Sequence, residues 1–495
     1  MLVEVEQSRV SISKAVDTKR KSQLGQFFTP AEIARFMVGM FGRSEYKSCR
    51  VLDAGAGIGS LSAAFLDKWV SGDFNFQRVE LDAFEIDQAL SPYLTQTFEK
   101  YRKYRNLTAS VRNGDFIHIA ADWLSGNLFA DILPKYTHAI LNPPYKKIRS
   151  DSAHRKVLRQ AGIETVNLYS AFVALSLSLL DVNGQLVAII PRSFCNGPYY
   201  RPFRKFILER AAIQHIHLFE SRNKAFKDDD VLQENIIIRL ERGSQQGTVV
   251  ISTSTDDSFS DLTIQKHPFN RIVFPDDPER FIHVPTSLEM NILELCPSIH
   301  YSLTDLKVNV STGPVVDFRL KEHLREMPEA ETVPLLYSNH LGSNGIEWPN
   351  IDKKKPNAIK RNHDTEKWLY PNGYYCVVRR FSSKEEKRRV MASVIDPSTF
   401  ADAPVLGFEN HLNVFHENRH GLPQALAFGL FVFLNTTAVD EHFRRFNGHT
   451  QVNATDLKQM KYPSRDTLIT LGKWAMEQVE LSQVKIDMKL ETLIS

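Results

Sequence analysis

The chain has 495 residues, which is more than one ordinary hydrophobic core serves, so roughly two or three domains are expected. Its 42% hydrophobic and 24% charged residues are typical of a folded globular protein, and its formal net charge of +3 argues against a histone-like protein without excluding a local basic face. The four cysteines form no CxxC pair, which indicates a reducing compartment and offers no zinc site.

The sequence predicts neither an export signal at the N-terminus nor a membrane span. Residues 1–22 lack the apolar region of a signal peptide. The most apolar stretches, 168–180 and 425–434, are shorter than the roughly 20 residues that a membrane span needs, so they predict buried helices. We therefore expect a cytoplasmic protein without a membrane partner.

The first half of the chain alternates short β-rich runs with helical stretches. The spacing of the first four runs is close to a βαβ repeat, which favours an α/β fold with a seven-stranded, mostly parallel, doubly wound (Rossmann-like) sheet. The seven runs are CRVLDAGAG (49–57), VELDAFEID (79–87), LTASVRNGDF (107–116), THAILNPPY (137–145), GQLVAIIP (184–191), IQHIHLF (213–219) and NIIIRL (235–240).

The regular alternation ends near residue 245. The polar stretches ERGSQQG (241–247) and STSTDDSFSD (252–261) follow, and the later pattern is irregular. We therefore place a first domain at 1–255 and a second, mixed α/β domain at 256–495, with a closing helix over 467–495 from its helical spacing.

The stretch VLDAGAGIGSL (51–61) predicts a tight turn between a strand and a helix. Gly55, Gly57 and Gly59 let the backbone approach a ligand closely, although a purely structural turn would explain the spacing as well. The stretch lacks the Lys-Ser/Thr of a phosphate loop and the GxGxxG of dinucleotide enzymes. A nucleoside without phosphates fits better, and S-adenosylmethionine is such a cofactor.

Polar side chains follow the ends of neighbouring predicted strands. In an open α/β sheet the ligand binds outside the carboxyl ends of the strands, so these side chains should meet. A carboxylate on the second strand can accept hydrogen bonds from ribose hydroxyls, and the third strand offers an acceptor and a ring to adenine. The residues are Asp53, Glu85, Asp87, Asp115, Phe116 and Asn142.

The motif NPPY (142–145) ends the fourth strand with a stiff turn, because proline cannot donate to a sheet ladder. In this position it resembles the catalytic motif of amino-group methyltransferases that use S-adenosylmethionine. The order GQFFTP (25–30), glycine turn, NPPY and second domain is similar to the γ class of DNA adenine-N6 methyltransferases of type II restriction-modification systems. Residues 379–389 and 447–457 look most like the PstI/BsuBI type.

The resemblance assigns roles to particular residues. It implies that Phe27, Thr29 and Pro30 close over the cofactor, and that Phe226 faces a target adenine flipped out of the duplex. As alternatives, the segment after residue 26 is an amphipathic helix capped by Thr29 that begins at Pro30, and Phe226 is a packed loop residue. The expected cofactor site comprises Phe27, Thr29, Pro30, Asp53, Gly55, Gly57, Gly59, Glu85, Asp87, Asp115, Phe116 and Asn142.

The chemistry of the NPPY turn follows from the weak nucleophilicity of an adenine amine, whose lone pair is delocalised into the ring. The side-chain oxygen of Asn142 and the carbonyl of Pro143 would accept its two hydrogens, Pro144 would stiffen the turn, and Tyr145 would stack on the base. No metal is required. The alternative is a turn that only ends a strand and packs a tyrosine.

Three basic clusters in the second half, 353–361, 379–389 and 443–453, predict contacts with duplex DNA, although one such cluster alone is as often a solvated face. The histidines of this half, His411, His416, His420 and His449, do not form a metal-ligand pattern. The candidate DNA contacts are Lys146, Arg379, Arg380, Lys384, Arg388, Arg444, Arg445, His449 and Gln451.

The sequence thus predicts a monomeric adenine-N6 methyltransferase that protects duplex DNA from a partner endonuclease without a stable complex between the two. A CTGCAG-type target is implied by the resemblance alone. The rival hypotheses are a methyltransferase acting on protein glutamine or RNA, a fused restriction enzyme, and a DNA-binding module with an inactive pocket. The large second half argues against a protein or RNA substrate. The lack of a nuclease motif argues against a fused restriction enzyme, and the intact NPPY argues against an inactive pocket.

Overall fold

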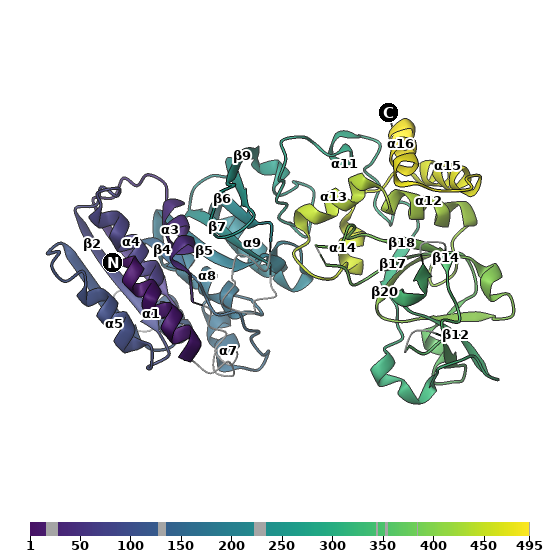
Figure 1. The fold of residues 1–495 in the computed structure, drawn as a ribbon, viewed down its shortest axis with the longest axis horizontal. Coiled ribbons are helices and arrows are strands. Elements are labelled where there is room, and N and C mark those ends of the chain that lie inside the picture. Colours follow the sequence, from purple (N-terminus) through teal and green to yellow (C-terminus); the bar gives the residue numbers. More distant parts are fainter. Residues whose placement is uncertain are drawn as a thin grey trace. The chain divides into compact units, whose positions relative to one another are not determined.

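The structure is a computed structural model that describes residues 1–15, 28–126, 135–221, 234–342, 345–351, 355–383 and 385–494. The chain forms two compact units, Met1–Leu288 and Glu289–Ser495 (Figure 1). Each unit has its own sheets and its own buried apolar clusters.

The first unit is built on one nine-stranded sheet with the order β3-β2-β1-β4-β5-β7-β6-β8-β9. Strands β1 to β5 are parallel to one another, and β7 runs antiparallel to both β5 and β6. The strands are β1 (Ser48–Ala54), β2 (Arg78–Glu85), β3 (Leu107–Asn113), β4 (Tyr136–Leu141), β5 (Leu180–Pro191), β6 (Ala211–Phe219), β7 (Asn235–Arg242), β8 (Thr248–Ser254) and β9 (Thr263–Pro268).

Helices cover both faces of this sheet (Figure 1). One face packs against α1 (Leu2–Ala15), α3 (Ala31–Gly39), α4 (Ser60–Val70) and α5 (Ser91–Glu99). The other packs against α6 (Phe116–Leu124), α7 (Ala153–Gln160), α8 (Leu168–Leu179) and α9 (Arg201–Arg210). Every residue of β4 is buried, as expected for a parallel strand covered on both sides.

The chain leaves β1 toward β2 and β3 on one side and later returns to β4 on the other. Such a reversal leaves a crevice outside the carboxyl ends of the two central strands, where open α/β sheets bind ligands. The register aligns these ends, since Asp53 of β1 pairs with Ala83 of β2 and with Ile140 of β4. The sheet therefore brings together the polar residues that follow β1, β2 and β4.

All seven expected strands are present, but the expected total of seven is too small. Strands β8 and β9 extend the sheet, and β8 buries Val249 and Ile251. The polar stretch 252–261 includes the connection between these two antiparallel strands. The expected boundary at residue 255 therefore lies inside the sheet, and the first compact unit continues to Leu288.

The second unit contains a four-stranded antiparallel sheet, β10-β20-β17-β18, a five-stranded sheet, β11-β15-β12-β19-β16, and the hairpin β13-β14. The strands are β10 (Asn309–Thr312), β11 (Leu324–Arg325), β12 (Thr332–Leu336), β13 (Leu341–Gly342), β14 (Gly345–Ile346), β15 (Ala358–Lys360), β16 (Leu369–Pro371), β17 (Tyr375–Arg379), β18 (Ala392–Ile395), β19 (Val405–Phe408) and β20 (Leu412–His416). The helices are α11 (Ile292–Leu295), α12 (Gln424–Leu434), α13 (Thr437–Phe446), α14 (Ala454–Gln459), α15 (Arg465–Met476) and α16 (Gln483–Ile494).

The end of the chain forms two helices rather than the one closing helix expected over 467–495. Helix α15 packs closely on the apolar α12, where a Cβ on Gly429 would overlap the backbone of Leu468. Val479, which continues the apolar spacing, is fully exposed between α15 and α16. Helical spacing alone did not reveal this break.

The two most apolar stretches of the sequence are the buried helices α8 and α12, as expected. Among the described helices, none is long and apolar enough to reach across a bilayer. All four cysteines are free thiols, and Cys49, Cys195 and Cys376 are buried.

Candidate active site

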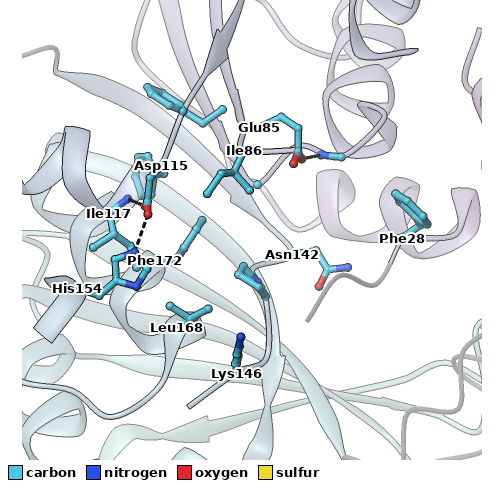
Figure 2. Close-up of a pocket in the computed structure, with 16 residues that line it drawn as sticks. Phe28, Glu85, Ile86, Asp115, Ile117, Asn142, Lys146, His154, Leu168 and Phe172 are labelled. Carbon is cyan, nitrogen blue, oxygen red and sulfur yellow. Dashed lines mark hydrogen bonds and ion pairs between the residues drawn. The ribbon is translucent and has the colours of Figure 1, made fainter. Parts of the chain in front are cut away.

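A cavity of about 200 Å³ lies at the carboxyl ends of the central strands of the first unit (Figure 2). The strand-end positions singled out from the sequence converge on it. Those that line it are Gly55, Gly57, Glu85, Asp115, Phe116, Asn142 and Pro144.

The glycine turn after β1 forms one wall of the cavity. Gly55 and Gly57 have φ angles of +79° and +59°, a region that glycine enters without the steric cost of a Cβ. A Cβ on Gly57 would meet the ring of Phe28 at 3.4 Å. The absence of side chains therefore lets Phe28 close over the turn.

Glu85 joins the end of β2 to this turn. Its Oε2 accepts a hydrogen bond from the Gly57 amide at 2.8 Å, and its Oε1 accepts one from the Asp87 amide at 2.7 Å. Burial raises the pKa of the Glu85 carboxyl above its usual value. Because each carboxylate oxygen carries two lone pairs, Glu85 can accept hydrogen bonds from a ligand while it holds the turn.

Asp115 is the N-cap of α6, and its Oδ1 accepts a hydrogen bond from the Ile117 amide at 2.9 Å. Its Oδ2 lies 2.6 Å from Nε2 of His154. Burial opposes ionisation of Asp115, but the hydrogen bond and charge of His154 bring its pKa below the usual value. An acceptor that stays ionised therefore faces the cavity.

An aromatic wall stands beside this acceptor. The ring centroid of Phe116 lies 5.2 Å from those of both Phe84 and Phe172, and all three side chains line the cavity. An aromatic, apolar wall next to a carboxylate suits a heteroaromatic ring that carries an amino group.

The amide of Asn142 is held from two sides. Its Nδ2 donates to Oγ1 of Thr29 at 2.9 Å. The Tyr145 hydroxyl lies 3.1 Å from Oδ1 of Asn142 and 3.1 Å from the Ile189 carbonyl, so its single proton serves one acceptor at a time. Burial raises the pKa of this phenol well above its usual value, which keeps it a neutral donor. The amide is thus fixed with its oxygen on the Tyr145 side.

Thr29 does not cap a helix, contrary to one of the two expectations for it. Helix α3 begins at Ala31, its N-cap is Pro30, and no side chain caps it there. The open Ala31 amide donates instead to Glu6 of α1 at 3.0 Å. This arrangement leaves the buried hydroxyl of Thr29 to accept from Asn142.

Several residues expected in the cofactor site lie behind the lining of the cavity. Asp53 is fully buried and accepts a hydrogen bond from the Ser62 hydroxyl at 2.6 Å, and burial raises its pKa to about 7. Gly59 is the N-cap of α4, and Asp87 accepts from the Ala89 amide at 3.0 Å in the turn before α5. These three residues shape the walls, and Pro30, Pro143 and Tyr145 likewise lie outside the lining.

Other lining residues were missed. Phe84, Ile86 and Gly114 are apolar or small neighbours of the polar residues at the ends of β2 and β3, and the rest lie on helices or just before α3. Phe28 is the neighbour of the expected Phe27, and the FF pair alone could not distinguish them. Lys146, expected at DNA, lines the cavity. The missed residues are Phe28, Phe84, Ile86, Gly114, Ile117, His154, Leu168 and Phe172. Phe27, Phe226 and Lys384 lie outside the described residues.

The basic side chains expected to contact DNA are largely used inside the second unit. Arg445 forms an ion pair with Glu294 of α11, and both side chains are mostly buried. Arg444 binds Asp440 at 2.7 Å and the Glu386 carbonyl at 2.8 Å. Arg388 donates to the Thr436 carbonyl at 2.7 Å.

The remaining candidates lie near the end of β17. Arg380 donates to the Asn410 carbonyl at 3.1 Å and to the side-chain oxygen of Gln451 at 3.3 Å. The neighbouring Phe381 is exposed, and its ring lies 4.8 Å from that of His411. Arg379 and His449 are half-buried. The half-buried Arg380 and Gln451, beside an exposed ring, are better placed to meet a ligand than Arg445.

Comparison with known proteins decides the family. The sequence model of the Eco57I restriction-modification methylase matches residues 73–226. The whole chain is 54% identical to the type II methyltransferase M.BsuBI of Bacillus subtilis and covers 98% of that protein. The chain belongs to the type II methyltransferases. A second member, M.PstI of Providencia stuartii, is 41% identical over 98% of this chain and 95% of its own length.

A solved structure agrees with this type II methyltransferase in fold. The cryo-EM structure of the DrdV–DNA complex matches 93% of this chain and 58% of that chain with a TM-score of 0.51 at 12% identity. At this identity the likeness shows the fold alone. Family membership makes the protein an enzyme that transfers methyl groups, and the cavity at the sheet switch point is its candidate active site.

Proposed function

We propose that this type II methyltransferase transfers a methyl group from S-adenosylmethionine to the exocyclic N6 amine of adenine in duplex DNA. The observation that carries the proposal is the Asn142 amide, fixed by Thr29 and Tyr145 at the edge of a nucleoside-type cavity. The lining of the cavity fits the nucleoside part of the cofactor, and the side-chain oxygen of Asn142 can accept a hydrogen from the target amine.

The lining of the cavity fits a nucleoside without phosphates. Glu85 is placed to accept hydrogen bonds from ribose hydroxyls, and Asp115 to accept from an adenine amine beside the Phe116 wall. Of the described lining residues only Lys146 and His154 are basic, and His154 is engaged with Asp115. When bound, S-adenosylmethionine supplies an electrophilic methyl group.

The turn then acts on the target amine. The oxygen of Asn142 and the carbonyl of Pro143 accept its two hydrogens, which draws the nitrogen toward tetrahedral geometry and frees its lone pair for the methyl group. Positive charge develops on the nitrogen as it is methylated, and two acceptors fixed in advance stabilise that charge. A strong base is unnecessary, because the proton becomes acidic only as the bond forms.

A base stacked inside a duplex cannot reach this turn, so the target adenine must be flipped out. Tyr145, which follows the two prolines, offers its ring to the base, and Phe226 is proposed as the opposite wall. The second unit recognises a short DNA sequence, and Arg380 and Gln451 are the residues proposed to contact its bases.

The proposed biological role is protection of DNA from a partner endonuclease that need not form a stable complex with the enzyme. The match to two type II methyltransferases along nearly their whole length supports this role over action on protein glutamine or RNA.

The proposal is tested by incubating the protein with duplex DNA and S-adenosylmethionine that carries a trideuterated methyl group. After digestion to nucleosides, mass spectrometry should find the label in N6-methyldeoxyadenosine. Label in N4-methyldeoxycytidine would overturn the choice of base, and unlabelled DNA would overturn the reaction.

A further inference from the structure

His154 has no role in the mechanism above, yet it lies inside the site. It belongs to the first turn of α7, in the segment that links the NPPY turn to α8, and its side chain lines the cavity with Asp115 and Lys146 (Figure 2). Arg159, further along α7, binds Glu164 at 2.9 Å, and Arg155 also pairs with that carboxylate. Leu158 of α7 is fully buried in the apolar core that also includes α6 and α8, which fixes the helix and hence the position of the imidazole.

The imidazole completes the set of contacts that orient Asp115. One oxygen of the carboxylate is held by the Ile117 amide and the other by Nε2 of His154. Held at both oxygens, the carboxylate cannot rotate, and the second lone pair of each oxygen has a fixed direction. A donor entering the cavity therefore meets an acceptor that is already oriented.

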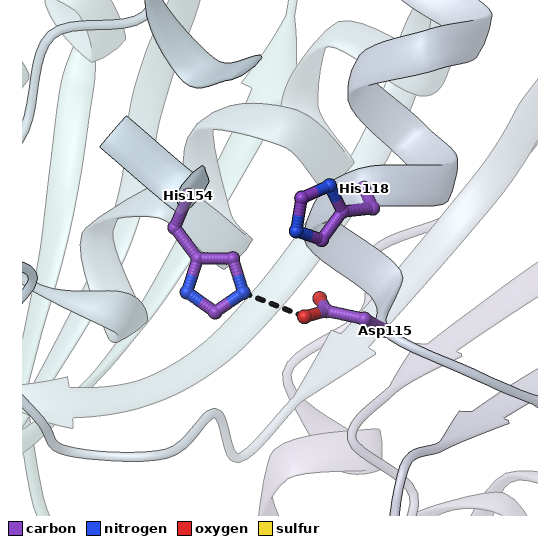
Figure 3. A group of neighbouring side chains, drawn as sticks. All are labelled: Asp115, His118 and His154. Carbon is purple, nitrogen blue, oxygen red and sulfur yellow. Dashed lines mark hydrogen bonds and ion pairs between the residues drawn. The ribbon is translucent and has the colours of Figure 1, made fainter. Parts of the chain in front are cut away.

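His118 lies near this pair, and the three side chains together resemble a metal site (Figure 3). The ring centroids of His118 and His154 are 5.2 Å apart. However, His154 and Asp115 are only 2.6 Å apart, a hydrogen-bond distance. Ligands of a tetrahedral zinc ion, with bonds of about 2.0–2.1 Å, would lie about 3.3 Å apart. The geometry favours a hydrogen bond over a bridging ion.

We propose that His154 is a positioning residue for the cofactor, because it orients the Asp115 carboxylate that receives the amino group of the cofactor's adenine ring. The inference rests on the proposed function, and it adds a residue of α7 to a site otherwise built from strand ends, the segment before α3 and residues of α6 and α8.

The electrostatic surroundings of His154 support this role. Its hydrogen bond to Asp115 raises the pKa of the imidazole above the usual value, while burial and the charge of Lys146 act in the opposite direction. The charged and titratable groups near it are Asp115 and His118 from α6 and Lys146 from the NPPY segment. When protonated, His154 carries a hydrogen on both ring nitrogens and donates to Asp115 through Nε2, which favours the ionised carboxylate.

The test measures binding of two ligands without DNA, so that turnover does not interfere. One ligand is S-adenosylhomocysteine, and the other is its analogue in which hydrogen replaces the 6-amino group. His154→Ala should weaken binding of the first about tenfold, the loss typical of a hydrogen bond to a charged group. It should leave binding of the analogue unchanged, because the analogue has no amine for Asp115 to receive.

Two further variants separate positioning from folding. His154→Gln keeps an N–H donor and should restore most of the affinity for S-adenosylhomocysteine. His118→Ala changes a histidine of the same cluster that lies outside the cavity lining, and should bind both ligands as the wild type does. When the concentration of S-adenosylmethionine is varied, His154→Ala should methylate DNA with a near-normal kcat and a raised KM for S-adenosylmethionine.

Three results would overturn the inference while leaving the proposed function intact. They are unchanged affinity of His154→Ala for S-adenosylhomocysteine, equal loss for both ligands, and equal loss in His118→Ala. Failure of the wild-type protein to bind S-adenosylhomocysteine or S-adenosylmethionine at all would instead overturn the proposed cofactor, and the inference with it.

Discussion

The two compact units use their polar side chains in opposite ways. In the first, Glu85, Asp115 and Asn142 follow separate strands and converge on one cavity. In the second, Arg444 and Arg445 belong to one basic cluster of the sequence and form ion pairs within the unit. A polar residue at the end of a parallel strand has its place set by the sheet, whereas helix α13, which carries both arginines, imposes no such convergence on its basic side chains.

Of the substitutions that test this contrast between the units, the one at Arg445 should have the largest effect, and that effect is on stability. Arg445→Ala removes the cation of a mostly buried ion pair with Glu294, which should lower the free energy of unfolding by about 3–5 kcal/mol. Chemical denaturation followed by circular dichroism measures this loss. Arg380→Ala, at a half-buried arginine that donates to a carbonyl and a side-chain amide and has no carboxylate partner among the described residues, is the matched control and should lose much less. If Arg445→Ala kept full stability and weakened only DNA binding, the contrast between the units would fail.

In the first unit, Asn142→Ala should remove catalysis and little else. Loss of one fixed acceptor for the developing charge should lower kcat by about 10²–10³, or about 2.7–4 kcal/mol, while binding of S-adenosylmethionine persists. Single-turnover methylation and equilibrium binding measure the two effects separately. Substitution of the exposed Asn75 by alanine should change neither. Turnover of Asn142→Ala within about tenfold of wild type would exclude the amide-acceptor mechanism.

Asp53 offers a pH-dependent test of a strand-end residue that shapes the cavity wall. Burial raises its folded pKa to about 7, above the value in the unfolded chain, so the folded state holds the proton more tightly. The stabilisation this provides is complete below the unfolded pKa and is lost as the pH rises through about 7.

Relative to Asp53→Asn, the free energy of unfolding of the wild type should therefore fall by about 1.4 kcal/mol per pH unit between about pH 5 and pH 7. Urea titrations of both proteins across this range measure the difference. A constant difference between them would show that Asp53 is ionised throughout, and a widening in favour of the wild type would reverse the assigned sign.

The smallest effect is expected at Thr29. Thr29→Val removes the acceptor for the Asn142 amide hydrogen and should cost about 1 kcal/mol of transition-state stabilisation, close to a fivefold loss of kcat. Thr29→Ser keeps the hydroxyl and should stay near wild type. Equal activity of the valine and serine variants would show that Tyr145 and the backbone orient Asn142 without Thr29.

The contrast between strand ends and irregular or helical segments also explains which parts of the fold and of the site the sequence predicts. Hydrophobic runs and glycines located the first seven strands and the turn, because strands buried on both faces of a sheet, such as β4, leave a strong pattern. Strand β8 was missed, since its buried Val249 and Ile251 precede a polar connection that reads as a linker. His154 and Phe172 were missed because helices α7 and α8 bring them to the cavity, and no strand end marks them.

The role of Thr29 shows a different limit. Its place before Pro30 predicts an N-cap from local chemistry, but Glu6 of another helix binds the first amide of α3 instead. A tertiary contact replaced the local one and left the hydroxyl to Asn142. Local sequence rules do not predict this contact, because Glu6 and the Ala31 amide are far apart in the chain.

The most direct test of the account is modified-base sequencing of duplex DNA exposed to the wild-type protein and S-adenosylmethionine, with Asn142→Ala as the paired control. The account predicts N6-methyladenine at one adenine within a single short sequence, and unmodified DNA with the variant. Methylated cytosine, or N6-methyladenine scattered over unrelated sequences, would contradict it.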